Sequence, residues 1–323
     1  MRKPRTAEGY SLELAVEARR MCLYIATILG DLLDEVVVVG GLVPYLIIDQ
    51  DTDTTERHVG TRDLDLGLSL AVLDEELYKD ISARLRDRDF RHGLNEEGNP
   101  TRQTWVLPDQ RISVDFLIPR SDRGPAAGRL QNLESDFAAI VTPALPLAFR
   151  DFVVVPIEDR TPREELARRD VRVCGPAAFV VMKAHALRLR GENKDAYDLV
   201  YTLQSYGDGT VREVADRFAA IANTLEARDA LTFLAEDFAS PEHLGPKRAA
   251  EFRTGGSDAR VQADAFGYVS ARGRSSGMIA TVRRRAPYSP HTLHNPSGNG
   301  SSSPNHTRIG RSPSYRSVRT VPQ

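Results

Sequence analysis

Two cysteines and no long apolar run set the first limits on this chain of 323 residues. Cys22 and Cys174 are too few for a disulfide framework or a cysteine metal site. Both have apolar neighbours, so we expect buried free thiols in a reducing compartment. No uninterrupted apolar run reaches the ~18 residues of a membrane-spanning helix. The basic start MRKPRTAEGY also lacks the apolar stretch of a signal peptide. These absences predict a cytoplasmic protein that does not bind membranes.

Several catalytic motifs are absent, and the charge is unevenly distributed. The sequence has no Walker loop, no zinc-ligand spacing and no serine nucleophile elbow. Residues 265–323 carry nine arginines and no lysine, aspartate or glutamate. The chain before position 265 therefore holds 34 of the 43 basic residues and all 45 acidic ones, which gives it a net charge of −11. Such an acidic part disfavours binding a nucleic-acid backbone over its whole surface, and any RNA contact would need a local basic patch.

The most informative stretch is residues 36–70, VVVVGGLVPYLIIDQDTDTTERHVGTRDLDLGLSL. Four consecutive valines predict a buried strand. Gly40 and Gly41 end this strand where the backbone must turn sharply or approach a ligand closely. We expect a helix from Leu42 to Ile48, whose first-turn N–H groups would favour an anion such as phosphate.

Two aspartates lie in the second apolar run of this stretch. Residues two apart in a strand share a face, so Asp63 and Asp65 point the same way while Leu64 and Leu66 point to the core. Two carboxylates on one face suit Mg²⁺ held together with substrate phosphates. The alternative is a solvated turn that happens to carry two acids.

These motifs resemble the DNA polymerase β-like nucleotidyltransferase superfamily, in which two glycines before a helix are followed by two acids flanking an apolar residue on a strand. Gly40-Gly41, the TRDLD motif of residues 61–65 and the KDAYD motif of residues 194–198 look most like its AbiEii type, the toxin family of abortive-infection systems. The resemblance covers roughly residues 30–205. It implies a nucleotidyltransferase fold, Mg²⁺ as cofactor, an NTP as substrate, the 3′ end of tRNA as acceptor and a cognate antitoxin as partner.

A third carboxylate is needed for two metal ions about 3.5–4 Å apart. Asp115 fits best, because it lies within the apolar strand VDFLI, where an unpaired charge would be costly to bury. By resemblance, it would hold the catalytic metal and draw the proton from the acceptor hydroxyl. We expect its carboxyl group within about 8 Å of those of Asp63 and Asp65. Otherwise it is a strand-edge carboxylate paired with Arg62 or Arg111.

Three further side chains are candidates for contacts with the nucleotide phosphates. Thr61 and Arg62 precede the acidic pair, and arginine offers a planar fork of donors, although surface arginines are common. Lys183 lies in the mostly apolar segment FVVMKAHAL, where a lysine needs a partner. The resemblance gives it a phosphate contact; the alternative is a core lysine whose amine reaches solvent.

The KDAYD motif contributes Lys194, Asp195 and Asp198 to the predicted nucleotide site. Lys194 and Asp198 are four residues apart on a predicted helix, so an ordinary surface ion pair is the alternative. The family pattern often has Arg-Asp where this chain has Lys-Asp, which keeps the charge but loses the bidentate geometry.

The overall pattern predicts an α/β protein whose mixed β-sheet is followed by helices and a disordered tail. We assign residues 1–160 to a catalytic nucleotidyltransferase domain and 161–269 to a helical domain. Residues 270–323, rich in Ser, Pro and Arg, are expected to be disordered and dispensable for stability. The expected helices are 11–33, 42–48, 74–88, 176–190, 194–204 capped by Asn193, 210–222 and 225–238; the expected strands are 36–39, 63–66, 104–107, 112–118, 137–141, 145–149 and 152–157, with a surface loop at 119–135.

The leading hypothesis is therefore an Mg²⁺-dependent nucleotidyltransferase that moves an NMP unit onto an acceptor hydroxyl. Transfer to a small molecule, as in the aminoglycoside-modifying members, is the alternative, because the acidic part suits a cationic acceptor. A third hypothesis is a nucleotide-binding module without catalysis, which Asp115 facing away from Asp63 and Asp65 would favour.

Overall fold

The four valines of β1 (Val36–Val39) are completely buried and lie near the middle of a nine-stranded mixed sheet. The computed structural model describes residues 4–50, 56–69, 75–95, 97–121, 124–270 and 278–285, all within the compact unit Met1–Pro287. The other strands are β2 (Asp63–Leu68), β3 (Arg91–Leu94), β4 (Pro100–Val106), β5 (Ser113–Pro119), β6 (Leu130–Glu134), β7 (Phe137–Thr142), β8 (Phe152–Arg160) and β9 (Leu166–Cys174).

The sheet order brings distant parts of the sequence together. The strands follow the order β3-β4-β5-β2-β1-β9-β8, and β7 pairs with both β5 and β6. β2 runs parallel to β5 and antiparallel to β1, whereas β1 runs parallel to β9. Both strands that carry the predicted metal ligands, β2 and β5, are therefore adjacent inside the sheet.

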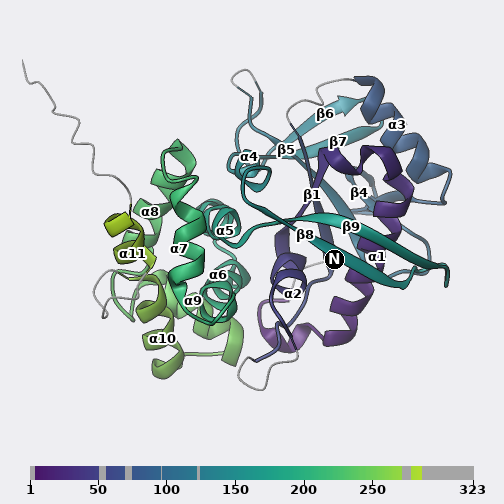
Figure 1. The fold of residues 1–323 in the computed structure, drawn as a ribbon. Helices are drawn as coiled ribbons and strands as arrows, with labels where there is room; N and C mark the ends of the chain where they lie inside the picture. The colour runs from purple at the N-terminus through teal and green to yellow at the C-terminus, as the bar shows by residue number, and fades with distance from the viewer. Residues whose placement is uncertain are drawn as a thin grey trace, which may run out of the picture. The chain divides into compact units, whose positions relative to one another are not determined.

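The first helix packs on the sheet, whereas several helices that follow β9 in the chain pack on one another. α1 packs against β8 and β9, and the Ser11 side chain caps it by accepting the Leu14 N–H at 3.3 Å. α5, α6, α8 and α9 pack on one another (Figure 1). The helices are α1 (Leu12–Leu29), α2 (Val43–Ile47), α3 (Glu75–Arg86), α4 (Leu145–Ala148), α5 (Pro176–Arg190), α6 (Asn193–Ser205), α7 (Val211–Ala219), α8 (Leu225–Asp237), α9 (Leu244–Thr254), α10 (Ala259–Val269) and α11 (Met278–Arg285).

Two expectations are confirmed, the class of fold and the free, buried state of the two cysteines. The mixed sheet followed by helices agrees with the predicted nucleotidyltransferase fold. Cys22 and Cys174 are free and buried, and burial raises the pKa of Cys22 to about 12, so the thiols are neutral. None of the described helices is long and apolar enough to cross a membrane.

Some of the predicted strands and loops around the sheet are wrong. The predicted strand 145–149 is the short helix α4, because Pro146 has no N–H for a ladder and suits a first helical turn. The predicted loop 119–135 contains β6, and β9 was not predicted. β9 pairs along its whole length with β8, so a domain boundary after residue 160 would cut this hairpin, and the sheet instead ends at Cys174.

The helical part also differs from the prediction. Asn193 is the first residue of α6 rather than its cap, and α9 and α10 were not predicted. α11 lies inside the segment expected to be disordered, yet its Met278, Ile279 and Val282 are buried and it packs against α7. Apolar burial of this kind offsets the entropy of ordering a helix. The rest of the predicted tail, residues 271–277 and 286–323, lies outside the described residues.

Candidate active site

Two adjacent parallel strands bring three carboxylates together. Asp65 on β2 lies directly opposite Asp115 on β5 in the register, and Asp63 lies opposite Ser113. Leu64 and Leu66 point to the core, being 0% and 2% exposed. One carboxylate oxygen from each aspartate lies within 4.8 Å of the other two. The predicted convergence of the three carboxyl groups is confirmed, and the arrangement is not a solvated turn.

Two threonines hold these carboxylates in place. Thr61 donates its hydroxyl to Asp63 Oδ1 at 2.7 Å, and Thr104 on β4 donates to Asp115 Oδ1 at 2.6 Å. Arg111, one suggested partner of Asp115, instead pairs with Glu17 at the surface. A hydroxyl donor fixes the direction of the carboxylate that accepts its hydrogen bond.

The two glycines lie against this cluster. Gly40 has a φ of +70°, and a Cβ there would come 1.8 Å from Asp65 Oδ2. A Cβ on Gly41 would meet Thr61 Oγ1 at 2.7 Å and Lys194 Nζ at 3.3 Å. Gly40 is therefore required both by its left-handed backbone and by the approach of Asp65. After a single 3-10 turn, Gly40–Leu42, the chain continues into α2.

A buried network of charges joins α5 to α6 beside the carboxylates. Lys183 Nζ donates to Asp195 Oδ1 at 2.9 Å and to Asp198 Oδ2 at 2.7 Å, and Lys194 Nζ donates to Asp198 Oδ1 at 2.7 Å. The Asp198 side chain is 0% exposed and that of Lys194 is 14% exposed, so their pair is not an ordinary surface one. Lys183 thus has the partners that its apolar helix requires.

Arg190 supplies the bidentate contact that Lys194 lacks. Its Nε and a terminal nitrogen both donate to the Asp195 carboxylate at 2.8 Å. Arg190 ends α5, and the left-handed Gly191 that follows it turns the chain into α6. Sequence reasoning missed Arg190, whose only signal was its place five residues before Asp195.

His58 completes the network and was also missed. The Gly60 N–H donates to His58 Nδ1 at 3.1 Å, so Nε2 carries the proton and donates to Asp198 Oδ1 at 2.9 Å. The imidazole is completely buried and packs against the rings of Tyr197 and Tyr201 at 5.5 and 4.9 Å. It ties the segment before Thr61 to α6. A histidine five residues before Asp63 is too common a feature to have indicated this.

The pKa values show which groups are charged. Burial lowers the pKa of His58 to about 4, and its hydrogen bond to Asp198 only partly opposes this, so the ring is neutral at pH 7. Burial raises the pKa of Asp198, but the ammonium groups of Lys183 and Lys194 outweigh it and hold the carboxyl well below its usual value. Burial lowers the pKa of Lys183, yet the two aspartates raise it above normal overall. Asp198 is therefore ionised, and Lys183 is protonated.

These groups surround a pocket of about 140 Å³. Eight predicted site residues line it: Gly41, Thr61, Asp63, Asp65, Lys183, Lys194, Asp195 and Asp198. Four residues that were not predicted complete the lining: Pro4, Tyr10, Arg190 and Glu192. Gly40 and Asp115 do not line the pocket directly, but both lie next to Asp65, which does. Arg62 is not among the lining residues in the part of the chain that the structure describes.

The fold and this pocket define a class of protein, the nucleotidyltransferases, in which paired acids on a strand lie beside a glycine turn. The sequence pattern of one family, described as nucleotidyl transferase AbiEii toxin of type IV toxin–antitoxin systems, matches residues 58–271. The chain belongs to this AbiEii family. No match is found among the curated proteins. Membership in a toxin–antitoxin family implies a nucleotide substrate and an antitoxin partner.

Proposed function

We propose that the protein is an Mg²⁺-dependent nucleotidyltransferase that transfers NMP from an NTP to an acceptor hydroxyl. The observation that carries this proposal is the convergence of Asp63, Asp65 and Asp115 within 4.8 Å, beside a pocket whose lining includes three cationic side chains, those of Lys183, Arg190 and Lys194. Oxygen ligands alone suit a hard cation such as Mg²⁺. When bound, Mg²⁺ would supply positive charge to the phosphate oxygens.

The cationic side chains would bind and orient the triphosphate. An ammonium group has three donors. In the described network Lys194 uses one of them on Asp198, and Lys183 uses two, so both retain donors for phosphate oxygens. Asp195 and Asp198 hold these ammonium groups in fixed positions, and Arg190 adds a guanidinium near Asp63 and Asp65. Positioning of this kind supplies most of the catalysis in phosphoryl transfer.

The chemical step would use Asp115 as the proton acceptor. The acceptor hydroxyl oxygen forms a bond to the α-phosphorus, the bond from that phosphorus to the bridging oxygen breaks, and pyrophosphate leaves. The proton of the hydroxyl passes to the Asp115 carboxylate. Thr104, which donates to Asp115 Oδ1, would keep the other oxygen directed for this task.

The acceptor proposed first is the 3′ end of tRNA, in line with a growth-arresting toxin. A cationic small molecule is the second candidate, because the chain before residue 265 carries a net charge of −11. The hypothesis of a nucleotide-binding module without catalysis would have been favoured by Asp115 facing away from Asp63 and Asp65. The three carboxylates instead lie close together, so this hypothesis is not favoured.

The test is to incubate the purified protein with each labelled NTP, Mg²⁺ and either total tRNA or an aminoglycoside. We expect label in one acceptor with wild type and at least a hundredfold less with Asp115→Asn, since a positioned base contributes roughly 10²–10⁴-fold. Asp229→Asn, at an exposed position of α8, is the matched control. Transfer by Asp115→Asn at the wild-type rate, or no transfer to either acceptor, would contradict the proposal.

A further inference from the structure

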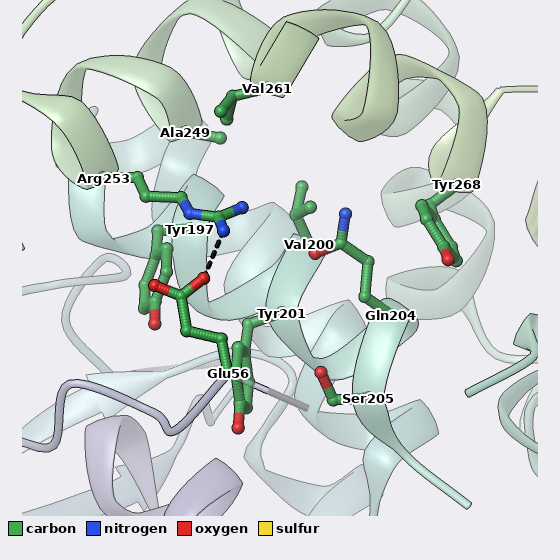
Figure 2. A pocket seen from close by; sticks show the side chains of 10 residues that line it. All are labelled: Glu56, Tyr197, Val200, Tyr201, Gln204, Ser205, Ala249, Arg253, Val261 and Tyr268. Atoms are coloured by element: carbon green, nitrogen blue, oxygen red, sulfur yellow. Dashed lines mark hydrogen bonds and ion pairs between the residues drawn. The ribbon is translucent and has the colours of Figure 1, made fainter. Parts of the chain in front are cut away.

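A second pocket, of about 250 Å³, lies along α6 next to the candidate active site. Lys194 and Asp198 face the first pocket, whereas Tyr197, Tyr201 and Gln204 face the second. Successive helical residues are rotated by about 100°, so the two pockets occupy neighbouring faces of one helix. α9, α10 and the segment at Glu56 complete the second pocket (Figure 2).

One wall of this pocket is aromatic and firmly held. Tyr197 and Tyr201 are 8% and 5% exposed, and Tyr197 packs on Phe252 with ring centres 4.9 Å apart. Both tyrosines also contact the buried ring of His58. Burial raises the pKa of Tyr201 to about 12, so its phenol stays neutral. The aromatic wall is therefore preformed, and the ion pair of Glu56 and Arg253 lies beside it (Figure 2).

The opposite side offers polar groups with spare hydrogen-bonding capacity. Gln204 and Tyr268 line the pocket, and within the described ranges their side chains have no hydrogen-bond partner. In Figure 2 they lie across the pocket from Arg253, which pairs with Glu56. The side chains of this ion pair are 38% and 66% exposed, so the pair contributes little and readily exchanges partners.

We propose that this pocket binds a nucleobase. A carboxamide such as that of Gln204 presents a donor and an acceptor in one plane, which matches the edge of a base. Tyr268 offers a ring for stacking, and Arg253 offers a planar cation for the base or its ribose. The volume lies below the roughly 300–1,000 Å³ of pockets for drug-sized ligands, which favours a single base or nucleoside.

The proposal depends on these side chains alone and is independent of the nucleotidyl transfer proposed above. The base has two possible sources with the same chemistry, a free nucleoside or one nucleotide of a single strand. Because nucleosides carry no phosphate, their binding in the absence of metal ions reports on the second pocket rather than on the carboxylate cluster.

The test is calorimetric titration of the full chain with adenosine, guanosine, cytidine and uridine in EDTA. We expect saturable binding of at least one nucleoside. Tyr268→Ala should weaken it about tenfold, because the base loses the ring on which it stacks, whereas Tyr268→Phe retains it. Gln204→Ala should weaken binding and reduce the preference among bases, and Gln110→Ala in the β4–β5 turn is the control. Failure of all four nucleosides to bind, or equal binding by Tyr268→Ala, would overturn the proposal.

A second arm identifies the source of the base. A trinucleotide RNA made of the preferred base is titrated alongside the nucleoside at low and high salt. Tighter binding of the RNA that falls with salt would assign the pocket to a strand, since phosphate contacts release counterions. Equal or tighter binding of the nucleoside would assign it to a free ligand. Either result supports base recognition, and an inactive Asp115→Asn protein should give the same titrations.

Discussion

Protonation of His58 should destabilise the fold between pH 7 and pH 4. In the unfolded chain this imidazole titrates near 6.5, whereas burial against Tyr197 and Tyr201 lowers its pKa in the folded protein to about 4. In this interval the unfolded state binds more protons, so stability falls as the pH falls. Above pH 6.5 the ring is neutral in both states, and the stability that it contributes is fully present.

The size of the effect follows from the difference between the two pKa values. At about 1.4 kcal/mol for each pH unit, a fall from 6.5 to about 4 corresponds to about 3 kcal/mol. That is a large share of the roughly 5–15 kcal/mol that stabilise a typical domain. Asp195 and Asp198, whose pKa values lie below 3.8, lose their contribution only below pH 4 and therefore act in a separate interval.

Urea denaturation at pH 4, 5, 6 and 7 measures this dependence. His58→Gln keeps a donor for Asp198 but does not titrate, so its unfolding free energy should change by about 3 kcal/mol less than that of wild type over this range. His243→Gln, at an exposed position before α9, should behave as wild type. Nuclear magnetic resonance of the His58 ring gives the pKa directly. Parallel pH profiles for wild type and His58→Gln, or a ring that titrates near 6.5, would refute the reasoning.

Three other changes test the site and the fold. Gly41→Val should weaken NTP binding, because its side chain would push Thr61 and Lys194 aside; calorimetry that finds unchanged affinity would contradict a role in binding. Arg190→Lys should lower kcat/KM about tenfold through loss of a charge-assisted hydrogen bond to Asp195, with unfolding free energy near that of wild type. Deleting residues 270–323 removes the three buried apolar side chains of α11 and should cost roughly 4–9 kcal/mol, unlike the sequence-based expectation. Deleting only 288–323 is the control and should leave the melting temperature unchanged.

The predictions of secondary structure that were wrong or missing concern segments whose conformation depends on contacts with residues distant in the sequence. The segment 145–149 has the apolar composition of a strand, but Pro146 and packing of Leu145 near Gly67 make it a helix. β9 carries four charged residues among nine, which obscure it, and only its full-length pairing with β8 reveals a strand. α11 is short and arginine-rich, and it is ordered because its apolar residues pack on α7.

The sequence by itself determined the local features of the site. The period of two in a strand placed Asp63 and Asp65 on one face, the four valines predicted β1, and the two glycines marked the turn that ends it. It could not determine which strands would be neighbours. The parallel pairing of β2 with β5 places Asp115 beside Asp65, and the packing of α5 on α6 joins Lys183 to Asp195 and Asp198. Contacts between residues far apart in a chain depend on how whole faces pack, and the local pattern carries no record of that choice.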